Sequence, residues 1–300
     1  MELPLPFVAP GRVVWHHTDA AGLIGILRAG RFWASAPQSL NDESEILYGV
    51  GVLRGAVDER RSALPAAHRA LLDRALDDTM SASLCSTSYL FSATLEADSL
   101  NQWRNYSRRE GFALGVRVGP GLGMWAPAPD GPPARSPFSI QRWCRVVYDA
   151  AEQRDCVAQV LPRILGPASH AGPGSAGPVE LARQVLGALA TLFKHHAFAA
   201  EHEARFVVAD QPGGGVEQFR PGGRGIVPYV EVAQEGPPAG DGADDRGTAA
   251  PGARLPVVAV RCGPLPVEER DVATGLVRRL LARYGYDGVE VTSSAVPYRF

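Results

Sequence analysis

The sequence predicts an α+β protein in which a mixed or antiparallel β-sheet is flanked by helices. Segments with strand and helix patterns follow one another irregularly, unlike the regular alternation of βαβ units. No Gly-x-Gly-x-x-Gly motif follows a predicted strand, which argues against a doubly wound nucleotide-binding sheet. With 45% hydrophobic residues, the 300-residue chain can bury the core of a single domain spanning residues 1–300.

Helix and strand signals are clear in the first half of the chain. The apolar segment 12–18 predicts a strand, and Thr18 or Asp19 can cap a helix over 20–29 that ends at Gly30. Further strands are expected over 31–35, 81–89 and 111–118, and helices over 46–80, with a break near Pro65, and over 99–106.

The second half continues in the same irregular order. Glycine- and proline-rich residues 166–178 and the apolar-poor residues 234–255 are expected to form flexible loops. Strands are expected over 142–148, 204–209, 257–261 and 288–292, and helices over 151–165, 179–198 and 267–284.

Composition and charge argue against several classes of protein. The formal net charge of −2 provides no bulk attraction to nucleic acid or to an anionic membrane. The four cysteines show no Cys-x-x-Cys spacing, so neither a zinc site nor a disulfide framework is expected. The first residues lack the pattern of a signal peptide, and no segment reaches the roughly 18 apolar residues that span a bilayer. We therefore expect a cytoplasmic protein without membrane association.

The most informative segment is residues 192–208. It contains the only lysine of the chain, Lys194, and it places Glu201 and Glu203 two residues apart before an apolar run. In a strand, residues two apart point to the same face, which would put both carboxylates and Arg205 on one side. Such a group is typical of a site, and a structural ion pair with Arg205 or Lys194 is the alternative.

A second candidate region is the end of the first predicted strand. A neutral imidazole can donate to a ribose hydroxyl, and the helix N-terminus that follows Thr18 suits a diphosphate. Because neighbouring residues in a strand point to opposite faces, only one of His16 and His17 is expected to face a site, and we favour His17. A histidine buried in the core is the alternative.

Five other residues each have a structural and a functional interpretation. Asn41, Asp42 and Glu45 lie in a polar turn, where they either cap the next helix or bind a ligand or a metal. Trp103 and Tyr106 lie three apart on a predicted helix, where they either pack together or stack against a bound ring.

Two cationic residues and a serine-rich strand complete the candidates. Lys194 provides a compact ammonium group, or its charge simply complements a helix C-terminus. Arg299 can reach a phosphate, or it anchors the end of the chain. The run Ser86-Thr87-Ser88 is a weak signal, because such runs are common in strands.

Several segments, in order along nearly the whole chain, together resemble a bacterial family known as domain of unknown function 2971. That name implies no activity. The matching segments are Trp15-His16-His17-Thr18, Ile26-Leu27-x-x-Gly30, Leu40-Asn41-Asp42 with Glu45, Leu100-x-x-Trp103-x-x-Tyr106 with Gly111, Phe193-Lys194-x-x-x-Phe198-x-x-Glu201-x-Glu203-x-Arg205, and Ser294-x-x-Pro297-Tyr298-Arg299.

The chain is also similar, more loosely, to the ADP-ribosyltransferase superfamily. That fold has a split β-sheet with a histidine or arginine on the first core strand, a serine, threonine or tyrosine on the second, and a glutamate on a later strand. The resemblance implies that NAD is the substrate, that Glu203 stabilises an oxocarbenium-like transition state, and that Glu201 polarises the acceptor. The residues implied to bind NAD are His17, Thr18, Ser86, Ser88, Tyr106, Lys194 and Arg299.

The resemblance further implies a toxin or phage-defence effector whose acceptor is a nucleic acid or a protein. Two other functions stay open: a non-catalytic module that binds a nucleotide or nucleic acid, and a metal-dependent hydrolase that uses Asp42, Glu45 and Glu203. Convergence of His17, Ser86 or Ser88 and Glu203 on one cleft favours the first function, and convergence of the three acidic residues alone favours the last.

Overall fold

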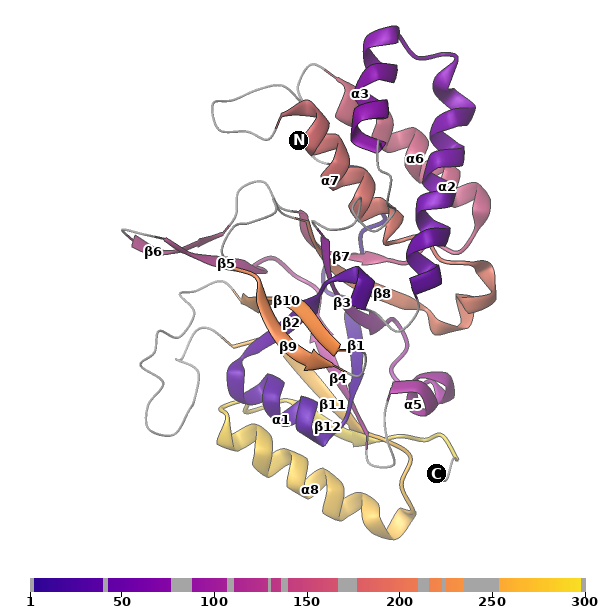
Figure 1. The fold of residues 1–300 in the computed structure, drawn as a ribbon. Helices are drawn as coiled ribbons and strands as arrows, with labels where there is room; N and C mark the ends of the chain where they lie inside the picture. The colour runs from indigo at the N-terminus through magenta and orange to yellow at the C-terminus, as the bar shows by residue number, and fades with distance from the viewer. Residues whose placement is uncertain are drawn as a thin grey trace.

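Helices cover two ends of a mixed β-sheet in the computed structural model, which describes residues 3–39, 43–76, 88–106, 111–128, 131–135, 140–166, 177–209, 216–222, 225–234 and 254–297. Figure 1 shows one group of helices at one end: α2 (Glu43–Arg61), α3 (Ala66–Leu76), α6 (Ala150–Leu165) and α7 (Pro178–Ala190). At the opposite end lie α1 (Ala20–Ala29) and α8 (Val267–Arg283), while the short α5 (Leu100–Tyr106) lies to one side of the sheet.

The described strands form one 12-stranded sheet. Its main path runs β12-β11-β4-β1-β3-β2-β10-β5-β6, and its neighbours are antiparallel except for the parallel pair β11 and β12. This mixed sheet with flanking helices confirms the predicted α+β class. The strands are β1 (Val13–Thr18), β2 (Arg31–Ser35), β3 (Ser88–Thr94), β4 (Phe112–Arg117), β5 (Leu122–Ala128), β6 (Gly131–Arg135), β7 (Ile140–Arg145), β8 (Glu203–Ala209), β9 (Gln218–Gly222), β10 (Gly225–Gln234), β11 (Val257–Cys262) and β12 (Glu290–Ser293).

The sheet is split along one edge of β3. Strand β8 pairs with the whole length of β3, from Ser88 to Thr94, and so occupies the other edge. Strands β1 and β2 must therefore share the remaining edge, where β1 pairs only at Thr94 and β2 only at Leu90. Between these two points β1 and β2 diverge, which leaves the edge of β3 at residues 91–93 open.

Helix α1 joins β1 to β2 and bridges this opening. Asp19 caps its N-terminus by accepting a hydrogen bond from the backbone N–H of Gly22 at 2.9 Å. Gly30 ends the helix in the left-handed conformation, with φ 63°, which glycine adopts without strain. Both ends confirm the predicted helix over 20–29.

Two hydrophobic cores lie on either side of the sheet. One packs the helices α2, α3, α6 and α7 on β8 and includes Leu53 and Val207, both fully buried. The other packs α1 and α8 on the central strands and includes Leu27, Phe32 and Val277. Among the described residues, no helix is long and apolar enough to cross a lipid bilayer.

The helix predicted over 179–198 is much shorter in the structure. It ends at Ala190, because the chain then turns and pairs with a neighbouring segment. The N–H of Val147 donates to the carbonyl of Leu192 at 2.8 Å, and the N–H of Lys194 donates to the carbonyl of Val147 at 3.2 Å. This pairing between distant segments overrides the apolar periodicity that predicted a continuous helix.

Other predicted boundaries are also corrected. The strand expected over 81–89 continues to Thr94 in the structure, since the apolar residues after Ser88 pair with β8; residues 81–87 lie outside the described part of the chain. The sequence missed β10 because Pro228 interrupts its apolar alternation. It also missed β5, β6 and β9, which lie next to glycine- and proline-rich residues. Most of the loops expected over 166–178 and 234–255 lies outside the described residues.

Close contact between α2 and α7 gives a first testable prediction. A Cβ atom at Gly49 would lie 2.0 Å from the backbone carbonyl oxygen of Ala190, whereas nothing lies within 4 Å of a Cβ at Gly51 on the same helix. We expect Gly49→Ala to lower the free energy of unfolding by about 1–3 kcal/mol through overpacking. Gly51→Ala should raise it by about 0.5–1 kcal/mol, because alanine favours the helix. Urea denaturation measures both, and equal effects would contradict the close packing.

Candidate functional site

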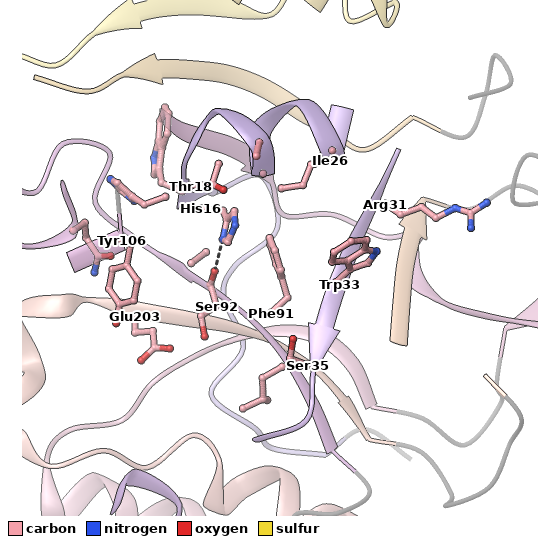
Figure 2. Close-up of a pocket in the computed structure, with 18 of the residues that line it drawn as sticks. His16, Thr18, Ile26, Arg31, Trp33, Ser35, Phe91, Ser92, Tyr106 and Glu203 are labelled. Carbon is pink, nitrogen blue, oxygen red and sulfur yellow. Dashed lines mark hydrogen bonds between the residues drawn. The ribbon is translucent and has the colours of Figure 1, made fainter. Parts of the chain in front are cut away.

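A cavity of about 530 Å³ opens where β1 and β2 diverge from β3, beneath helix α1 (Figure 2). This volume lies in the range of small-molecule sites. Figure 2 shows Tyr106 and Glu203 at one end of the pocket and Trp33 at the other, with His16 and Ser92 between them. At the sheet split, β1, β2, β3 and β8 therefore all contribute side chains to a common cavity.

His16 closes the open edge of β3. Its Nδ1 lies 2.9 Å from the backbone carbonyl oxygen of Ser92, and since that oxygen only accepts, Nδ1 carries the proton. In the neutral ring Nε2 is then an acceptor. Burial lowers the pKa of His16, although the bond to Ser92 opposes this effect, so the ring stays neutral near pH 7. Its ring lies 4.3 Å from the ring of Phe91.

His17 also lines the cavity, although only one of the two histidines was expected to do so. It is 7% exposed and packs edge-on against Trp103, with 4.5 Å between the ring centroids. Neither ring nitrogen has a hydrogen-bond partner within the described part of the chain. Burial and the neighbouring His16 lower the pKa of His17 to about 3, so this ring is neutral as well. Thr18, at the end of β1, lies beside it in the wall.

Glu203 begins β8 and forms part of the cavity wall. Arg205 donates two hydrogen bonds to its carboxylate, from Nε to Oε1 at 2.7 Å and from Nη2 to Oε2 at 2.8 Å. Burial by itself would raise the pKa of Glu203, but the charges of Arg205 and Lys194 outweigh burial and lower the pKa to about 2. The carboxylate is therefore ionised at any physiological pH.

Lys194 lies behind the cavity and joins three carboxylates. Its Nζ is 2.6 Å from Glu201 Oε2, 2.7 Å from Glu45 Oε1 and 3.3 Å from Glu203 Oε2. Arg205 also reaches Glu45, at 2.8 Å. We call these five side chains the Lys194–Arg205 cluster. With every member ionised, three carboxylates and two cations leave one net negative charge beside the pocket.

The geometry of Glu201 and Glu203 differs from the strand alternation that the sequence suggested. Glu201 ends a short 3₁₀ helix, η3 (His196–Glu201), and His202 has φ 45°, in the left-handed region. Thr94 holds this turn by donating from Oγ1 to the carbonyl of Glu201 at 2.8 Å, and Gln102 donates to the same carbonyl at 3.1 Å. The two carboxylates nevertheless converge, because both bind Lys194.

Two tyrosines flank Glu203. Tyr106 lies beside the carboxylate in the pocket (Figure 2), and the hydroxyl of Tyr148 accepts a hydrogen bond from the Glu203 backbone N–H at 3.0 Å. Burial, together with the nearby carboxylates, raises the pKa of Tyr106 to about 12. Burial also raises the pKa of Tyr148 to about 12. Both phenols therefore keep their protons at neutral pH.

The far end of the pocket contains cationic and aromatic side chains. Arg31 pairs with Glu231 on the adjacent strand. Arg220, on β9, donates from Nη2 to the hydroxyl of Ser35 at 3.0 Å and lies 5.8 Å from the ring centroid of Trp33. The pocket is thus polarised, with carboxylates at one end and guanidinium groups at the other.

The structure separates the remaining predicted site residues. Ser88 is fully buried and does not line the cavity. Ser92, four residues further along β3, lines the cavity instead. Lys194 is 3% exposed and is not among the residues that line the cavity; its Nζ contacts the three carboxylates instead. Glu45, whose side chain is 15% exposed, pairs with both cations. The candidates Asn41, Asp42, Ser86 and Arg299 lie outside the described residues.

Sequence reasoning missed Ser92, Trp33, Tyr148 and Arg220. Only Trp33 had a usable signal, since it shares one face of a predicted strand with Arg31 and Ser35. Trp103, by contrast, is a packing residue as expected: it is fully buried and donates to Asp98 at 2.8 Å.

No protein-family model, no curated protein and no solved structure matches this chain.

The ionised Glu203 gives a prediction for acid stability. Because its pKa in the folded protein lies below the ordinary value of about 4.3, it stabilises the fold above that pH and loses this contribution as the pH falls toward 2. We expect Glu203→Gln to be less stable than the parent protein at pH 6, and the difference in unfolding free energy to be roughly 2 kcal/mol smaller at pH 3. Urea denaturation at both values tests this, and a difference independent of pH would contradict it.

Proposed function

We propose that this protein is an NAD-dependent enzyme of the ADP-ribosyltransferase type. One observation carries the proposal: the split sheet brings His16 of β1, Ser92 of β3 and Glu203 of β8 to a single cavity. A histidine, a hydroxyl residue and a glutamate on three such strands are the set that the superfamily resemblance implies. The divergence of β1 and β2 is likewise consistent with a split-sheet fold of that type.

The chemistry suits an ionised carboxylate. Cleavage breaks the bond between the nicotinamide nitrogen and the ribose carbon; the bonding electrons leave with nicotinamide, which becomes neutral, and positive charge develops on the carbon. A fixed negative charge beside that carbon stabilises the transition state without reorganisation. Glu203 meets this requirement, because Arg205 orients it and keeps it ionised. A nucleophile then donates an electron pair to the carbon and loses its proton.

Other residues of the pocket would bind the substrate. His16 keeps Nε2 as an acceptor for a ribose hydroxyl, since Nδ1 is committed to Ser92. Aromatic rings, among them Phe91 and Tyr106, provide apolar surface for the nicotinamide ring. We assign Glu201 to orient the acceptor, because it lines the cavity next to Glu203.

Lys194 and Arg205 act as positioning residues in this proposal. They touch the carboxylates and hold them in place. We propose a nucleic acid or a protein as the acceptor and a role as a toxin or phage-defence effector, as the superfamily resemblance implies.

A non-catalytic nucleotide-binding protein is the second candidate. It is favoured by the bidentate contact of Arg205, which engages both carboxylate oxygens of Glu203. A metal-dependent hydrolase built on Glu45 and Glu203 is not supported, since Lys194 and Arg205 already lie between these carboxylates. Among the described residues, no group of three or more His, Cys, Asp or Glu side chains is arranged to hold a metal.

Release of nicotinamide from NAD+ tests the proposal. We expect the parent protein to release it and Glu203→Gln to lose at least about 100-fold in rate, because the charge facing the ribose carbon is removed. Glu45→Gln is the matched control: it removes a carboxylate from the same cluster, but Glu45 does not line the cavity. This control should retain activity within about tenfold.

The outcomes separate the two candidates. Equal losses in Glu203→Gln and Glu45→Gln would mean that the cluster acts only through stability. Binding of NAD+ without any release of nicotinamide, in the presence of protein and nucleic-acid acceptors, would favour the non-catalytic protein.

The net negative charge beside the pocket predicts a preference between the two forms of the dinucleotide. The nicotinamide ring is cationic in NAD+ and neutral in NADH, so we expect NAD+ to bind several-fold more tightly. Isothermal titration calorimetry measures both affinities. The preference should shrink in Glu203→Gln, and tighter binding of NADH to the parent protein would contradict the proposed orientation of the ring.

A further inference from the structure

Two arginines line the cavity, and within the described part of the chain Arg220 is the one without a carboxylate partner. It lies on β9 opposite Val227 of β10, and its side chain points to the same face of the sheet as Gln218 and Tyr229. Arg31, on that face of β2, pairs with Glu231, and Arg205 pairs with Glu203 and Glu45. Within the described residues, the contacts of the Arg220 guanidinium are the Ser35 hydroxyl and the Trp33 ring.

Arg220 lines the cavity and has hydrogen-bonding capacity that the described residues do not use. Its Nε is buried and has no partner within the described part of the chain. A buried, unsatisfied N–H of a charged group is costly, and an anion that accepts from it removes that cost. A guanidinium also presents its donors as a planar fork, which matches two oxygens of a phosphate.

Ser35 adds a second donor at the same point. Its hydroxyl accepts from Arg220 at 3.0 Å, which leaves its own hydrogen free to point elsewhere. Ser35 is buried and lines the cavity together with Arg220. Two donors, one from β9 and one from β2, therefore meet at the end of the pocket opposite Glu203; both strands pair with β10.

We propose that Arg220 and Ser35 form an anion subsite that binds the diphosphate of a dinucleotide. The subsite itself stands on the unpaired guanidinium and the shared wall, while its assignment to the diphosphate of NAD+ rests on the proposed function. The polarity of the pocket then sets one direction of binding: the cationic ring lies toward Glu203 and the phosphates lie toward Arg220. A nucleic-acid backbone presents the same phosphate chemistry and is an alternative source that the test separates.

Calorimetric titration with inorganic pyrophosphate tests the subsite directly. We expect the parent protein to bind pyrophosphate, Arg220→Gln to bind it about tenfold more weakly or worse, and Arg220→Lys to fall between them, since lysine keeps the charge and loses the fork. The matched control is Arg279→Gln, which makes the same charge change at an exposed position on α8. Circular dichroism spectra confirm that each variant is folded.

The subsite is overturned if the parent protein does not bind pyrophosphate, or if Arg220→Gln and Arg279→Gln bind it equally well. It is also overturned as a dinucleotide site if a single-stranded oligonucleotide binds through Arg220 while pyrophosphate and NAD+ do not compete with it.

Nicotinamide release separates this subsite from the proposed function. If NAD+ is cleaved, Arg220→Gln should raise KM about tenfold and leave kcat within a few-fold. Pyrophosphate binding through Arg220 without any NAD+ cleavage would leave the subsite standing and reject the enzyme. Cleavage of NAD+ with an unchanged KM in Arg220→Gln would support the enzyme and reject the subsite.

Discussion

The buried pairing of Arg205 with Glu203 is the interaction on which the site depends. Both side chains are almost completely removed from water, and burying either charge without its partner would cost several kcal/mol. This desolvation cost is offset by the hydrogen bonds that Arg205 donates: two to Glu203, one to Glu45 and one to the carbonyl of Thr191. Lys194 extends the same network to Glu201. The charges therefore join α2, the end of α7 and β8, and they fix an ionised carboxylate in the pocket wall.

The cavity exists because the sheet cannot continue past β3 on one side. Strands β1 and β2 pair with opposite ends of β3, so the carbonyl of Ser92 has no backbone partner from either of them. The side chain of His16 satisfies this carbonyl instead. A single hydrogen bond thus satisfies one backbone acceptor on an interrupted strand edge and holds an imidazole in the pocket. The same opening exposes carboxylates at one end and the Arg220 guanidinium at the other.

Local signals predicted those elements whose ends are set by nearby residues. Helix α1 has the expected bounds because Asp19 and Gly30 act within one turn of it. Predictions failed where a distant segment decided the structure. Helix α7 stops at Ala190 since the next residues pair with Val147, and β3 continues to Thr94 since it pairs with β8 up to that residue. Periodicity along the chain contains no information about either partner.

The sequence by itself determined which chemical groups are available: a lone lysine near two glutamates and an arginine, and a pair of histidines at the end of a strand. The tertiary structure decided how they are used. It bound His16 rather than His17 to Ser92, and it made Lys194 a buried partner of carboxylates. It also brought in Glu45, which lies 160 residues from the Arg205 that it contacts. Helix caps and strand alternation act over a few residues, whereas sheet register and the packing of α2 on α7 set contacts across the whole chain.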